Sequence, residues 1–97
     1  MLFFVFCEDK PDTAGLRQAT RDAHIAYLKD AGARVRLGGP TLGKDGNYDG
    51  GIMVVEADSL DAARSFVAAD PFVRAGVCEP ILIRPWRWLT GNPDLAQ

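Results

Sequence analysis

The chain is poor in the residues that usually hold transition metals. It has one histidine and two cysteines, Cys7 and Cys78, which lie far apart and form neither a metal-binding spacing nor a disulfide framework. One imidazole and two separated thiols do not make the usual zinc ligand sets. We therefore expect no metal and no other cofactor. Free thiols are typical of a reducing, cytoplasmic compartment, which is the localisation that we expect.

Long apolar runs and an excess of positive charge are also missing. No apolar stretch reaches the about 18 residues that cross a bilayer. The apolar opening Leu2–Cys7 has no basic segment before it and meets the acidic Glu8 at once, which favours a strand over a signal peptide. A net charge of −2 argues against a nucleic-acid or membrane partner. There is no phosphate-binding glycine loop and no nucleophile elbow. A small molecule is the expected ligand.

What the chain does have is enough apolar content for a core. At 97 residues and 47% hydrophobic content it is expected to be a single domain spanning 1–97, in which 89–97 form a tail. The apolar runs and their turn residues predict six elements in order. These are a strand at 2–7, a helix at 13–31, a strand at 33–37, a strand at 51–57, a helix that starts after Asp58 or Ser59, and a strand at 77–88.

This order predicts the fold class. Strand, helix, strand, strand, helix, strand is the ferredoxin-like βαββαβ sandwich, an α+β fold with a four-stranded antiparallel sheet and both helices on one face. Pro80 and Pro85 predict that the last strand is an edge strand or is broken there. The runs Leu2–Cys7 and Ile81–Ile83 are apolar on both sides. We therefore expect a second copy of the chain to cover the other face, giving a homodimer.

The 13–31 helix carries two stripes of different character. It is expected to start at Asp12 or Thr13 and to end at Gly32. One apolar stripe is predicted to pack on the sheet and comprises Leu16, Ala19, Thr20, Ala23, Tyr27 and Ala31. The second stripe runs along the margin of that face and comprises Arg17, Arg21, His24 and Leu28. This placement predicts a half-buried His24.

The segment Asp70-Pro71-Phe72 is the other candidate for chemistry. The residue before a proline avoids the helical region, so Asp70 should end the second helix and begin a turn that Phe72 anchors in the core. In the predicted topology this turn approaches the middle of the first helix. His24 can then act as a general base or acid, with Asp70 as the group that orients it. The alternative is a packing histidine and a turn-capping aspartate.

Other residues near this pair have two readings each. Arg17 and Arg21 can bind an anionic substrate group or can be solvated helix charges. The run Gly38-Gly39-Pro40 can let a ligand approach the backbone or can simply end a strand. We expect Cys7 to be a buried structural thiol, and the neighbouring strands to bring Cys78 close to it.

Several motifs together resemble one known family. In chain order they are Arg21-x-x-His24-x-x-Tyr27-Leu28, Gly38-Gly39-Pro40, Asp70-Pro71-Phe72 and Arg84-Pro85-Trp86. In this order the sequence from 1 to about 88 resembles the YciI-like (YCII-related) family. The resemblance implies a ferredoxin-like subunit that dimerises into an α+β barrel. It also implies an active site made of a histidine and an aspartate, which match His24 and Asp70.

The resemblance and the residues lead to two functional hypotheses. A few family-like proteins act on hydroxylated or chlorinated aromatic rings, which suggests a cofactor-independent lyase or isomerase for a small organic acid, lactone or phenol. The alternative is a non-catalytic ligand-binding or accessory dimer that uses the same cleft. Beside the catalytic pair, the residues expected to contact the substrate are Arg21, Arg17, Gly39, Pro40, Pro71 and Phe72.

Overall fold

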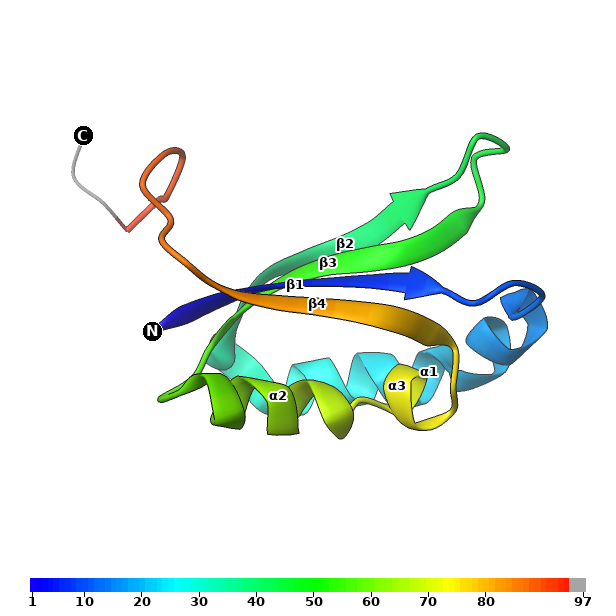
Figure 1. Cartoon of the computed structure of the whole chain (residues 1–97), viewed down its shortest axis with the longest axis horizontal. Helices are drawn as coiled ribbons and strands as arrows, with labels where there is room; N and C mark the ends of the chain where they lie inside the picture. The colour runs from blue at the N-terminus through cyan, green and yellow to red at the C-terminus, as the bar shows by residue number, and fades with distance from the viewer. Residues whose placement is uncertain (95–97) are drawn as a thin grey trace.

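The computed structural model describes residues 1–94, so 95–97 of the expected tail lie outside the described residues. The elements are β1 (Leu2–Asp9), α1 (Ala14–Ala31), the 3-10 turn η1 (Gly32–Arg34), β2 (Val35–Leu42), β3 (Tyr48–Glu56), α2 (Leu60–Ala68), α3 (Pro71–Arg74) and β4 (Cys78–Trp86). The strands form one antiparallel sheet in the order β2-β3-β1-β4. All helices lie on one face of it (Figure 1). The expected α+β ferredoxin-like fold is confirmed.

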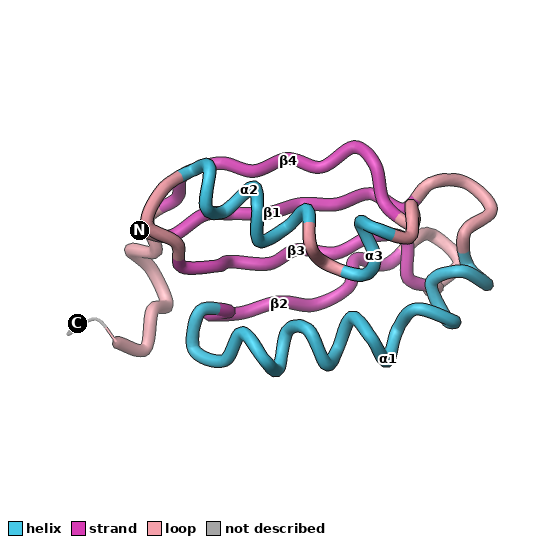
Figure 2. The backbone as a smooth tube through the Cα atoms, turned by 90° about the horizontal axis from the view of Figure 1, so that it is seen from below, coloured by secondary structure: helices cyan, strands magenta, loops and turns pink. Residues whose placement is uncertain are grey.

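The core lies between the sheet and the helices. Alternation along β1 points Phe3 and Val5 towards the helices, and both are fully buried. Val5 packs with Met53 and Val55 of β3 and with Val67 of α2. Figure 2 shows α1 and α2–α3 running side by side beneath the strands. This two-layer packing sets the distance between the helices and the sheet.

The helix boundaries follow their caps. The Oγ of Ser59 accepts a hydrogen bond of 3.1 Å from the backbone N–H of Ala62. Ser59 is therefore the N-cap of α2, a position for which the sequence offered both Asp58 and Ser59. Thr13 occupies the N-cap position of α1, although its Oγ1 donates to the Lys10 carbonyl oxygen instead. Gly32 ends α1 with a φ of 61°, a conformation that favours glycine.

The expectation that Gly38-Gly39-Pro40 ends the second strand is wrong. β2 continues through this run to Leu42 and pairs Pro40 with Gly51 of β3. The run is tolerated because β2 is an edge strand, where a proline's missing N–H faces away from the ladder. β4 forms the opposite edge, as its prolines Pro80 and Pro85 predicted.

The expected sheet-facing stripe of α1 is also wrong in part. Leu16, Ala19 and Ala23 are exposed, whereas His24 and Leu28 are half-buried on the side of the helix that faces the sheet. Tyr27 packs on Phe66 of α2, with ring centroids 5.0 Å apart. α1 therefore turns its second stripe towards the sheet, and this stripe is polar at Arg17, Arg21 and His24 and apolar at Leu28.

The other face of the sheet, which we call the open face, is apolar. By strand alternation and register it carries Phe4, Phe6, Ile52, Val54 and Leu82. Within residues 1–94 no helix lies on this side (Figure 1). The homodimer expected on this basis remains a prediction. In the same part of the chain, no helix has the length and apolar character needed to cross a membrane.

Candidate active site

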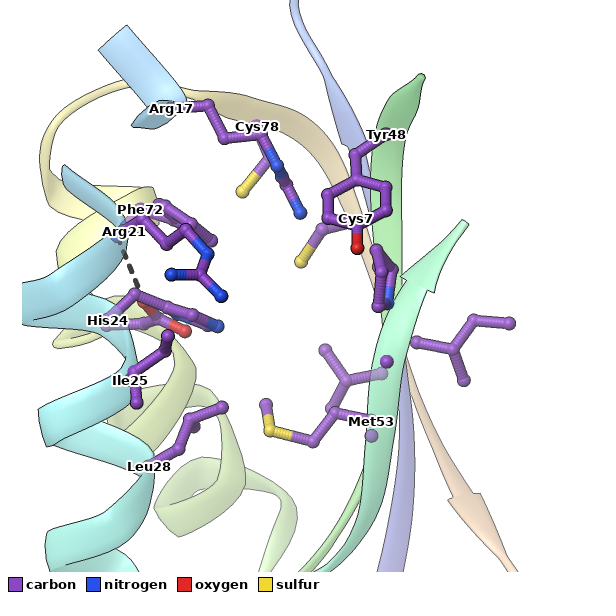
Figure 3. Close-up of a pocket in the computed structure, with 17 residues that line it drawn as sticks. Cys7, Arg17, Arg21, His24, Ile25, Leu28, Tyr48, Met53, Phe72 and Cys78 are labelled. Atoms are coloured by element: carbon purple, nitrogen blue, oxygen red, sulfur yellow. Dashed lines mark hydrogen bonds and ion pairs between the residues drawn. The ribbon is translucent and has the colours of Figure 1, made fainter. Parts of the chain in front are cut away.

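A cavity of about 270 Å³ lies between α1 and the sheet. Figure 3 shows side chains from the helices and the strands converging on it. Its walls are mainly apolar and include Ile25 and Leu28 of α1, Met53 of β3 and Phe72 of α3. A dry cavity of roughly 150 Å³ can hold benzene, so this volume suits a substituted single ring or a molecule of similar size.

His24 and Asp70 meet at the wall of this cavity. The Nδ1 of His24 lies 2.8 Å from the Oδ1 of Asp70, and the two side chains are 21% and 8% exposed. The same Oδ1 accepts a hydrogen bond of 2.9 Å from the backbone N–H of Phe72. An ionised carboxylate only accepts, so Nδ1 is the donor of this pair. In the neutral imidazole the lone pair then lies on Nε2, and the ring projects into the cavity (Figure 3).

A short helix holds both partners of the histidine ring. Asp70 is the N-cap of α3 and Pro71 is its first residue. This position favours proline, because the φ of proline is already helical and its missing N–H would have no partner within the helix. The ring of Phe72 stacks on His24, with centroids 3.9 Å apart and planes at 15°. The sequence correctly ended α2 before Asp70 but expected a turn where this one-turn helix forms. Pro71, expected to contact the substrate, does not line the cavity.

Arg17 lines the cavity but its charge is already paired. Its Nη1 donates to both carboxylate oxygens of Asp9, at 3.0 and 3.1 Å, and its Nη2 donates to the Gly50 carbonyl oxygen. Its guanidinium also lies over the Phe72 ring, 4.7 Å from the centroid. Burial raises the pKa of the Asp9 carboxyl, and the Arg17 guanidinium opposes that shift. Arg17 thus ties α1 to β1 and β3.

Arg21 is the more available cation. It lines the same cavity one turn further along α1, is exposed, and has no ion-pair or hydrogen-bond partner among residues 1–94. Figure 3 shows its guanidinium turned towards the space beside His24. Across from it, Gly38, Gly39 and Pro40 of β2 form part of the opposite wall. The structure therefore brings together all the expected substrate contacts except Pro71.

Some residues that line the cavity were not among those expected from the sequence. Tyr48 begins β3 at the end of the hairpin loop and faces the cavity, and nothing in its neighbourhood marked it. Met53 could have been found, because alternation along β3 places it on the helix side. Trp86 and Trp88 pack on each other and do not line the cavity.

The fold and this cavity define a class: a small ferredoxin-like protein with a histidine–aspartate pair at the wall of a ligand-sized cavity. A family model described as the YCII-related domain matches residues 1–87, and the chain belongs to that family. The protein YciI of Escherichia coli O6:H1 is 34% identical over 96 residues, covering 90% of this chain and 97% of that protein. An uncharacterised protein of Haemophilus influenzae is 32% identical over 95 residues, with the same coverage.

Solved structures show the same fold. The 5-chloro-2-hydroxyhydroquinone dehydrochlorinase of Burkholderia phenoliruptrix AC1100, in complex with 2,5-dihydroxybenzoquinone, is 35% identical. It superimposes with a TM-score of 0.86 over 95% of this chain and 99% of its own. The protein Atu4242 of Agrobacterium tumefaciens shares the fold at 12% identity, with a TM-score of 0.54 over 96% of this chain and 98% of its own.

Proposed function

We propose that this protein is a cofactor-independent enzyme that moves a proton on a small, planar, acidic organic molecule. His24 is the general base and acid, and Asp70 is the residue that positions it. The observation that carries this proposal is the 2.8 Å contact between His24 Nδ1 and Asp70 Oδ1 at the wall of the cavity. The contact leaves Nε2 as the ring atom available to a ligand.

The chemistry follows from that geometry. Nε2 accepts a proton from a carbon or hydroxyl of the bound molecule, and the carboxylate of Asp70 stabilises the imidazolium that forms. Return of the proton to another atom gives an isomerase. Expulsion of a leaving group from the carbanion or phenolate gives a lyase. A positioned base of this kind contributes roughly 10²–10⁴-fold to a rate.

The walls of the cavity favour a ring with an anionic substituent. Apolar side chains and the Phe72 ring offer flat contact surfaces, and Arg21 offers a charge for a phenolate or carboxylate. The related dehydrochlorinase was solved with a hydroxylated quinone, which supports hydroxylated aromatic rings over lactones and aliphatic acids. We therefore place phenols first in the substrate class.

The test is a substrate panel with a matched variant. Hydroxylated and chlorinated phenols, lactones and small organic acids are incubated with the protein in D₂O, and NMR follows product formation and deuterium uptake. The wild type should turn over or exchange at least one phenol, and His24→Gln should be slower by roughly 10²–10⁴-fold while remaining folded. Saturable binding without turnover or exchange across the panel would instead support the ligand-binding alternative and overturn the enzymatic one.

A further inference from the structure

The cavity has a pair of thiols that the proposed acid–base chemistry does not use. Cys7 of β1 and Cys78 of β4 both line it, and both are free. Figure 3 shows their sulfur atoms directed into the same space, on the side of Phe72 and Arg17. A small solute in the cavity can therefore reach two sulfur atoms that are otherwise enclosed by the fold.

Strand pairing explains why residues so distant in sequence meet here. β1 and β4 are antiparallel neighbours, in which Cys7 pairs with Ile81 and Asp9 pairs with Cys78. The register shifts between Cys7 and Asp9, so the two cysteines are diagonal neighbours across an irregular step. Cys7 packs against the buried cluster of Phe72, Val77 and Cys78. Their proximity is thus imposed by the sheet.

We propose that Cys7 and Cys78 are a redox modification site: a hydroperoxide that enters the cavity converts them into an intramolecular disulfide, which alters the wall beside His24. The proposal does not depend on the enzymatic function. The reduced pair is the resting state in a reducing compartment, and the disulfide forms only when an oxidant reaches the cavity.

The two thiols are hydrogen-bonded to each other, and this contact affects their pKa values in opposite directions. Hydrogen bonding with Cys7 lowers the pKa of the Cys78 thiol, against the opposing effects of burial and of the Asp70 and Asp9 carboxylates. The same hydrogen bonding, together with burial, raises the pKa of Cys7. The thiolate is the reactive form, so these directions favour Cys78 as the thiol that attacks the oxidant and Cys7 as the thiol that attacks second, and the two single serine variants described below decide the order.

The reaction balances with one hydroperoxide. The Cys78 thiolate attacks a peroxide oxygen, so that an S–O bond forms, the O–O bond breaks and an alkoxide or hydroxide leaves with the proton that Cys78 lost. Cys7 then attacks the Cys78 sulfur, the S–S bond forms, the S–O bond breaks, and the hydroxide departs as water with the Cys7 proton. In sum, two thiols and one hydroperoxide give a disulfide, one alcohol or water, and one further water.

The disulfide changes the packing behind the catalytic histidine. Atoms in van der Waals contact lie about 3.5–4.0 Å apart, whereas bonded sulfurs lie about 2.05 Å apart. One or both cysteine side chains must therefore move, within the buried cluster that Cys78 forms with Phe72 and Val77 and against which Cys7 packs. Phe72 in turn stacks on His24. We therefore expect formation of the disulfide to change the environment of the His24 imidazole by shifting the Phe72 ring that stacks on it.

Mass spectrometry tests the covalent step. The reduced protein is treated with one to three equivalents of hydrogen peroxide, denatured, and alkylated with N-ethylmaleimide. The wild type should lose the mass of two hydrogen atoms, take up no alkyl group, yield a Cys7–Cys78 cross-linked peptide, and revert with dithiothreitol. Cys7→Ser should stop at a sulfenic acid that dimedone traps at Cys78, and Cys78→Ser should react on the order of tenfold more slowly. Oxidation to sulfinic acid without cross-linking, or a disulfide between two chains, would overturn the proposal.

The single histidine gives the second readout. His24 provides the only imidazole signals in the NMR spectrum of the chain, so no assignment is needed. Those signals should shift when the wild type is oxidised, return on reduction, and stay unchanged in peroxide-treated Cys7→Ser/Cys78→Ser. A disulfide that leaves them unmoved would refute the effect on the cavity wall. The wild-type measurements need neither turnover nor a folded variant, so they stand apart from the test of the enzymatic function.

Discussion

His24 lies flat on Phe72, with ring centroids 3.9 Å apart, and its Nδ1 binds the aspartate two positions before that phenylalanine. The segment 70–72 therefore determines both the plane of the imidazole and its rotation within that plane. An imidazole held at two points in this way has a defined orientation, which is what the proposed role as a general base requires.

Two substitutions separate the roles of Asp70. Asp70→Asn keeps an oxygen that can accept from the Phe72 N–H, so the cap of α3 survives, but it removes the charge that stabilises the imidazolium. We expect turnover to fall by about 10²-fold or more. Asp70→Ala also removes the cap, which should cost a further 0.5–2 kcal/mol, as an order-of-magnitude estimate, in the free energy of unfolding. Urea unfolding and steady-state rates measure the two effects. Full activity of the asparagine variant would leave Asp70 with a purely structural role.

The two arginines should respond differently to the same change. Arg17→Gln leaves the nearly buried Asp9 carboxylate without its ion-pair partner, and we expect a loss of about 2–4 kcal/mol in the free energy of unfolding. Arg21→Gln should change that free energy by less than about 0.5 kcal/mol and should weaken the binding of anionic ring compounds. Urea unfolding and calorimetric titration distinguish them. A destabilised Arg21→Gln protein with unaltered binding would contradict the assignment.

Tyr27 makes stability depend on pH in the alkaline range. Its hydroxyl donates to the Phe66 carbonyl oxygen at 2.7 Å. Burial first, and the Asp70 carboxylate second, raise its pKa above the ordinary value of 10.0, while Arg34 opposes the shift. Because the folded state binds this proton more tightly, the stabilisation is complete below the unfolded pKa and disappears as the pH rises through the folded value.

Stability profiles of two proteins test this. The free energy of unfolding of the wild type should decline above pH about 10, and Tyr27→Phe should lack that part of the decline. The absorbance titration of tyrosinate should lose its late phase in the same variant. Parallel profiles of the two proteins would mean that the pKa of Tyr27 is the same in the folded and unfolded states.

The open face predicts a homodimer. Leu82 on this face is 46% exposed, and Leu16 on the outer side of α1 is 42% exposed, which makes them a matched pair. Leu82→Glu should weaken association by about 10²-fold or more, because a side chain worth 1.5–3 kcal/mol is lost from both copies of a symmetric interface. Leu16→Glu should have no effect. Light scattering measures both, and a wild-type monomer at micromolar concentration would argue against the dimer.

The parts predictable from sequence were those with local causes. The proline after Asp70 ends α2 through its effect on the preceding residue, whatever lies elsewhere in the fold, and the four strands and two long helices occur in the predicted order. The errors had distant causes. The sequence indicated that Leu16, Ala19 and Ala23 form a buried stripe. In the structure Arg17 binds the carboxylate of Asp9 on β1, and this ion pair turns the second stripe towards the sheet. Likewise, Gly38-Gly39-Pro40 continues β2 because that strand is at the edge, which depends on the pairing of the whole sheet.

The shared oxygen of Asp70 also links the orientation of the His24 ring to local fluctuations of α3. Its Oδ1 accepts from both the Phe72 amide and the His24 ring, so an opening of the first turn of α3 that rotates the carboxylate breaks both bonds at once. The amide proton of Phe72 then becomes free to exchange with solvent. The hydrogen-exchange rate of this one amide therefore measures how often His24 loses its hydrogen bond to Asp70, and it can be measured without any substrate.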